Sequence, residues 1–137
     1  MADALYPLAR QSFLAGSPTI DWDTDDIKCV LVRSYTYSAA HQFYTDIAGG
    51  GGTVVATSAN FGGKTATNGV SDANDITFTA VGAGAACQSL IIYRDTGVAA
   101  TSPLIAYIDA ATGLPVTPNG GDITVQWDAG ANKIFKL

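Results

Sequence analysis

The chain has 137 residues, of which 47% are hydrophobic and only 14% are charged, and its net charge is −5. This length suits a single domain with its own core, and the hydrophobic content excludes an intrinsically disordered chain. The seven basic residues form no run that could neutralise a row of phosphates, which argues against nucleic acid as a partner.

A helix is the first expected element, over residues 3–15. Asp3 is placed to cap it, Pro7 lies in its first turns, and Gly16 follows as a stop signal. The stretch lacks the basic leader and long apolar core of a secretory signal, and no later stretch reaches 18 consecutive apolar residues. We therefore expect neither a signal peptide nor a membrane span.

Residues 20–32, IDWDTDDIKCVLV, place four aspartates in six positions directly before an apolar run. Asp21, Asp23 and Asp25 have the alternating spacing that begins an EF-hand calcium loop. That loop needs glycine at its sixth position and glutamate at its twelfth, whereas this chain has aspartate and valine there and no glutamate at all. We expect a solvated turn before a strand over 28–33 that is buried on both faces. An irregular surface calcium site is the alternative.

A second helix is expected over residues 38–48, with Ser38 as its cap and the glycine run 49–52 as its end. Its apolar residues recur at helical spacing. His41, the single histidine of the chain, lies early in this segment. Nothing in the sequence pairs it with a nucleophile, so a hydrolase of the serine or cysteine type is not favoured.

The remaining apolar stretches alternate or are rich in β-branched residues, which predicts strands at 53–57, 76–81, 89–95, 104–109, 123–127 and the closing IFKL. The turn DTGVAATSP predicts a hairpin between the third and fourth of these. About eight short strands and two short helices predict one mainly-β domain over residues 1–137. We expect a β-sandwich of the jelly-roll or immunoglobulin-like type. Residues 1–16 form its N-terminal helical segment, and 49–75 its glycine-rich, loop-prone region.

Other candidate chemistry is sparse. GGKT at 62–65 is similar to the end of a phosphate loop, but Ser58 occupies the position of the first glycine and no amphipathic helix follows. Cys29 and Cys87 lie in expected strands and predict two buried free thiols, with a disulfide between neighbouring strands as the alternative. No zinc motif is present. We expect no cofactor, no metal and no enzymatic activity. The alternative that stays open is a glycosidase, because two aspartates of this chain that are distant in sequence could come together as its catalytic pair.

The aromatic residues allow two interpretations. At strand positions they usually fill a core, but they could also line a sugar-binding face. The residues concerned are Trp22, Tyr35, Tyr37, Tyr44, Tyr93 and Tyr107.

The last third of the chain, LIIYRDTGVAATSPLIAYIDAATGLPVTPNGGDITVQWDAGANKIFKL, resembles small virion proteins encoded by tailed bacteriophages. The stretches ALYPLARQSFLAG, IDWDTDDIKCVLV, YTYSAAHQFYTDI and VVATSANFGGKTATNGV follow the order seen in that group. The resemblance implies a structural role in the particle, as a capsid decoration or cement protein. It supplies no catalytic residue.

The resemblance implies synthesis in the bacterial host cytoplasm, a place on the capsid surface of the virion, and the major capsid protein as partner. Self-association as a homotrimer would present one patch three times and gain from multivalency. Candidate partner contacts, chosen for irregular or N-terminal position, are Leu5, Tyr6, Phe13, Asn60, Phe61 and Lys64. The alternative function is a tail or head-fibre module for host attachment or glycan binding. A polysaccharide-active enzyme is a more distant third.

Overall fold

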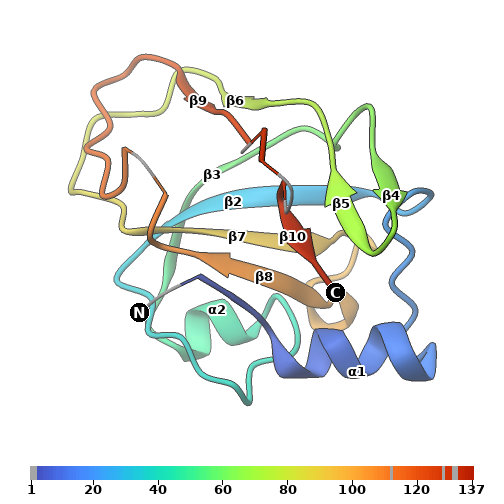
Figure 1. Ribbon diagram of the computed structural model, residues 1–137. Coiled ribbons are helices and arrows are strands. Elements are labelled where there is room, and N and C mark those ends of the chain that lie inside the picture. Colours follow the sequence, from blue (N-terminus) through green and yellow to red (C-terminus); the bar gives the residue numbers. More distant parts are fainter. Residues whose placement is uncertain (1–2, 112, 128, 131–132) are drawn as a thin grey trace.

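The computed structural model describes residues 3–111, 113–127, 129–130 and 133–137. Its strands form three antiparallel sheets (Figure 1). The largest has the order β1-β8-β7-β2-β3, with bounds Ala4–Leu5, Leu104–Ile108, Ser89–Arg94, Ile27–Arg33 and Thr53–Thr57. A second sheet has the order β10-β5-β4, with bounds Phe135–Lys136, Val70–Asp72 and Thr65–Thr67. The third pairs β6 (Ile76–Phe78) with β9 (Ile123–Val125).

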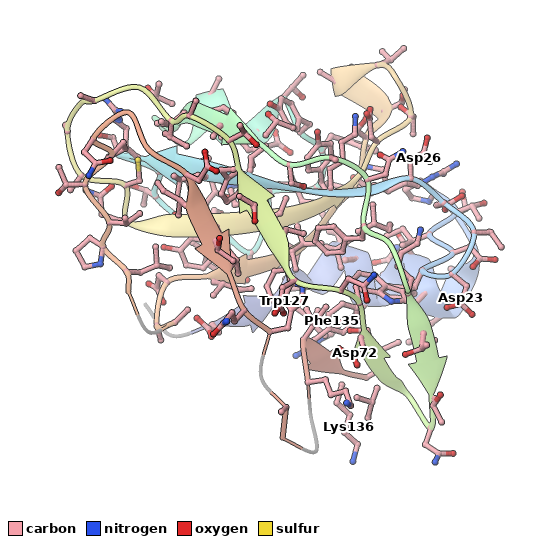
Figure 2. All side chains as sticks on the ribbon, turned by 90° about the horizontal axis from the view of Figure 1, so that it is seen from above. Asp23, Asp26, Asp72, Trp127, Phe135 and Lys136 are labelled. Atoms are coloured by element: carbon pink, nitrogen blue, oxygen red, sulfur yellow. The ribbon has the colours of Figure 1, made fainter. Side chains whose placement is uncertain are left out.

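The helices are short. Helix α1 spans Pro7–Ala15, α2 spans Asp46–Gly49, and a 3-10 turn spans Ala99–Thr101. Figures 1 and 2 together show the two small sheets over one face of the five-stranded sheet, α2 on the opposite side, and α1 along the β1–β8 edge. The predictions of a mainly-β chain with two short helices and of a β7–β8 hairpin are confirmed.

Strand β2 lies at the centre of the core. Its residues Cys29 to Val32 are fully buried. Leu31 pairs with Leu90 on β7, and both side chains face β9, whereas the adjacent pair of Val30 and Ile91 faces the α2 side. The continuous apolar run therefore reflects burial on both faces, as the sequence predicts. Cys29 and Cys87 are buried and unpaired, which confirms the prediction of two free thiols.

The predicted start of the first helix was wrong. Asp3 does not cap it; its carboxylate accepts hydrogen bonds from the backbone N–H groups of Asp109 and Ala110. Residues 4–5 pair with β8 instead, and the helix begins only at Pro7, whose fixed φ suits a first helical position. Gly16 ends the helix in the left-handed conformation, φ 70°, as expected.

The predicted second helix was wrong over most of its length, because only Asp46–Gly49 is helical. Before it, the chain crosses the sheet as a loop that bonds to the start of β8. Tyr44 N–H donates to the Ser102 carbonyl, and Leu104 N–H donates to the Gln42 carbonyl. The Asp46 carboxylate accepts from the N–H groups of Gln42 and Phe43. These bonds replace those that a longer helix would have made.

The loop-prone region contains a hairpin that the sequence analysis missed. Strands β4 and β5 pair antiparallel around Asn68 and Gly69, both with positive φ. Asparagine followed by glycine is the typical sequence of a tight hairpin turn, so a local signal for this element was present. Strand β10 pairs with β5 and joins the hairpin to the end of the chain.

Candidate functional site

The aspartate-rich segment forms a closed turn. Asp21 accepts hydrogen bonds at Oδ1 from the N–H groups of Asp23, at 3.2 Å, and Thr24, at 3.3 Å. Asp25 Oδ2 accepts from the N–H of Asp21 at 2.8 Å. Trp22, within the turn, is buried in the core and fixes its position. Two of the carboxylates therefore satisfy backbone groups, as aspartates in turns commonly do.

Basic side chains neutralise this turn where it enters β2. Arg94 at the end of β7 places Nε 2.9 Å from Asp25 Oδ2 and donates through Nη1 to the Thr19 carbonyl at 2.6 Å. Lys64 donates to the Asp25 carbonyl. Asp23 and Asp26 lie apart on the outside of the domain (Figure 2). In the described ranges no three His, Cys, Asp or Glu side chains lie close enough to hold a metal ion.

We expect Asp21→Ala to lower the free energy of unfolding by about 1 kcal/mol, because two backbone N–H groups lose their acceptor. Urea unfolding with and without added calcium measures this loss. Asp23→Ala is the matched control, since its exposed carboxylate accepts no hydrogen bond within the described chain. A calcium-dependent gain in stability that Asp21→Ala abolishes would instead show that the turn is a calcium site.

His41 lies in the loop before α2 rather than on a helix. Its Nδ1 is 2.6 Å from the Tyr35 hydroxyl, which is in turn 2.9 Å from the hydroxyl of Tyr6. Tyr37 and Tyr107 complete a tyrosine–histidine cluster, with ring centroids 5.3 Å apart. Within the described chain, no serine or cysteine bonds to the His41 ring.

Two phenols of this cluster, those of Tyr35 and Tyr6, are poor acids. Burial raises the pKa of Tyr35 to about 12. Burial, and then the hydrogen bond with Tyr35, raise the pKa of Tyr6 still further. At neutral pH both hydroxyls therefore stay protonated, and neither can act as a phenolate nucleophile or base. The arrangement holds a loop against the sheet rather than activating a reacting group.

The GGKT segment lacks the geometry of a phosphate loop. Gly63 has φ 62°, and a Cβ there would lie 2.6 Å from Asn74 Oδ1. Lys64 is bound to the aspartate-rich turn, and Thr65 begins β4 rather than a helix. The glycine therefore serves close packing against Asn74.

The candidate partner contacts divide into two groups. Leu5, Tyr6 and Phe61 are core side chains with exposures of 9%, 0% and 4%, so a partner does not reach them on the folded chain. Phe13 is half-buried, with its ring centroid 6.3 Å from that of Phe135. Asn60 is exposed and Lys64 is partly exposed. The structure does not gather the six residues into one patch.

The aromatic residues are inside the domain. Trp22 packs edge-on against Phe61 and Phe135, with centroids 5.9 Å and 5.2 Å away, and its Nε1 donates to the Asp72 carbonyl. Tyr44 packs on Tyr93 at 4.8 Å. Every Phe, Tyr and Trp of the described chain is buried or half-buried. No exposed aromatic platform of the kind that stacks on sugars is present among these residues.

A groove of about 850 Å³ lies between the five-stranded sheet and β9. Leu31, Leu90 and Ile108 form its floor, and Ile123 and Val125 form one wall. The lining also includes two titratable side chains, Asp3 and Lys133. Asp3 accepts backbone hydrogen bonds from Asp109 and Ala110, and Lys133 pairs with Asp72, so the two are engaged elsewhere and are not set against each other for acid–base chemistry.

No family model matches the chain, and the search of curated proteins found no significant match. In the described part of the chain, no helix is long and apolar enough to cross a membrane.

Proposed function

We propose that this chain is a non-enzymatic structural protein of a bacteriophage virion that binds the capsid surface as a decoration or cement protein. The proposal starts from the resemblance of its sequence stretches to small phage virion proteins. The structural observation that supports it best is the β4–β5 hairpin, because an arm that extends from a compact domain can reach a neighbouring subunit.

The hairpin is exposed and firmly attached. All three residues of β4 are exposed, as are Asn68 and Gly69 at its tip. Ser71 bonds through its side chain to the backbone of Phe135 in both directions, at 3.2 Å each. Lys133 Nζ lies 3.2 Å from Asp72 Oδ2. An arm fixed in this way loses little conformational entropy on binding.

The major capsid protein is the proposed partner, and a homotrimer the proposed assembly on the shell. The burial of the aromatic side chains favours this function over glycan binding, which would use an exposed aromatic face. A tail or head-fibre module for host attachment is the competing function, and the location of the protein in the particle separates the two.

Cryo-electron microscopy of the virion that carries this protein tests the proposal. We expect density for the domain at three-fold or quasi-three-fold axes of the shell, with the β4–β5 hairpin against the capsid. Density confined to a tail or fibre would contradict it.

The hairpin can be tested separately by adding purified protein to capsids that lack it. We expect the double variant T65K/T67K to lose binding, because two lysines on the β4 edge disturb a fitted contact. The matched control is T53K/T57K, which changes two exposed threonines of β3 and should still bind. Equal binding by both variants would exclude the hairpin as the contact.

A further inference from the structure

Strand β3 is an outer strand of the five-stranded sheet with one side unoccupied. Its inner side pairs with β2 from Thr53 to Thr57. On its outer side no strand is paired, and within the described chain no other backbone or side-chain group bonds to Val54, Val55 or Ala56. Figure 1 shows β3 at the rear of the sheet.

The other sheet edges carry the features that normally prevent pairing between molecules. Strand β1 is two residues long, β4 is three residues long and follows Lys64, and β10 contains Lys136. Strands β6 and β9, the two edges of the third sheet, carry no charge but are only three residues long. Strand β3 has five residues, TVVAT, without charge or proline, and four of them are β-branched. Such an edge is a template for a further strand, because its N–H and C=O groups lack partners.

The sequence of β3 fits a second copy of itself. In an antiparallel pair centred on Val55, Thr53 faces Thr57 of the other copy, Val54 faces Ala56, and Val55 faces itself. Thr–Thr and β-branched pairs stabilise neighbouring strands. A two-fold contact requires this kind of self-complementary surface.

Local geometry and charge both bear on such a pair. The register between β2 and β3 skips Val55, so β3 bulges at its central residue. A bulge increases the local twist and can turn an edge away from a partner, so the pair requires the outer N–H and C=O groups on both sides of Val55 to bond despite the bulge. With a net charge of −5, two copies repel least where they meet through an uncharged strand.

We propose that two copies of this chain associate through antiparallel pairing of their β3 strands, which joins their five-stranded sheets into one continuous sheet. The contact is independent of the capsid role, since it uses an edge of the five-stranded sheet, whereas the β4–β5 hairpin belongs to the second sheet.

Sedimentation velocity of the full chain over a concentration series tests this contact. We expect a dimer for the wild type. The variant T53K/T57K places two lysine–lysine pairs across the interface and should raise the dissociation constant roughly tenfold or more. The variant T53K/T57D places a lysine opposite an aspartate twice and should restore the dimer, with affinity that falls as salt is added.

T65K/T67K, with the same change on the β4 edge, is the control and should remain dimeric. Both substituted threonines of β3 are exposed, so circular dichroism should show that each variant folds. A monomeric wild type would overturn the proposal. The proposal would equally be overturned if T53K/T57K dimerised as well as the wild type, or if T53K/T57D remained monomeric. A trimer in place of a dimer would overturn the β3 contact, because a two-fold edge contact closes at two copies, but it would agree with the homotrimer proposed for the shell.

Discussion

Raising the pH above about 10 should unfold this domain, and the loss of structure should coincide with ionisation of its tyrosines. Burial is the first cause of a raised pKa in five of the six: Tyr6, Tyr35, Tyr44, Tyr93 and Tyr107. Between the unfolded value near 10 and the folded values, the folded chain binds more protons than the unfolded chain. Stability contributed by these groups is therefore complete below pH 10 and is lost as the pH rises through the folded values.

Absorbance of the phenolate at alkaline pH, recorded together with far-ultraviolet circular dichroism, measures this transition. Tyr93→Phe is an informative variant, because no hydrogen bond of the Tyr93 hydroxyl is found in the described chain. It should change the free energy of unfolding little at neutral pH. Above pH 10 the free energy of unfolding should fall less steeply with pH, because one fewer tyrosine releases its proton on unfolding. Ionisation of all tyrosines near pH 10 with an unchanged dichroism spectrum would contradict the burial argument.

The elements that local pattern predicts well are interior strands whose burial on both faces produces a short continuous run of apolar residues. Strand β2 was visible as CVLV because both faces of a central strand are buried. Strands β7 and β8 were visible for the same reason, and the turn between them is rich in small residues. In each case the sequence contains the whole signal within a few residues.

The segment before α2 shows where the same pattern misleads. Phe43, Tyr44 and Ile47 recur at helical spacing, yet each has a different long-range partner. Phe43 bridges to Pro103, Tyr44 packs on Tyr93, and Ile47 enters the core. Apolar residues that anchor a loop at separate points can reproduce the period of a helix, and only the tertiary contacts distinguish the two.

The hairpin was missed for the opposite reason. Strands β4 and β5 have three residues each; β4 is exposed throughout, and the one buried residue of β5 is Ser71, so neither strand shows a hydrophobic period. They are held by β10, more than sixty positions later, through pairs such as Ser71 with Phe135. The Asn68–Gly69 turn was the one local signal. The tyrosine–histidine cluster likewise joins residues from three separate segments, so the aromatic residues alone could not show that they meet.

In the tyrosine–histidine cluster, the hydroxyl groups of Tyr6 and Tyr35 should depend on each other in their contributions to the free energy of unfolding. Tyr6 is fully buried, and its hydroxyl has one side-chain partner in the described chain, Tyr35, at 2.9 Å. Tyr35→Phe removes that partner and also the group that bonds His41 Nδ1. We expect a loss of about 1–3 kcal/mol in unfolding free energy, since a buried hydroxyl is left without a hydrogen bond.

Removing both hydroxyls should cost less than the sum of the two single losses. In Tyr6→Phe/Tyr35→Phe the unsatisfied hydroxyl is gone, and the two rings still fill the same space against Tyr37 and Tyr107. Urea unfolding of the wild type, both single variants and the double variant gives the coupling, which we expect to be about 1 kcal/mol. Additive losses would show that the two hydroxyls are solvated independently. Coupling of the expected size would mean that this bond holds the loop containing His41 against the sheet, because Tyr6 and Tyr35 are the residues that join the start of α1 to that loop.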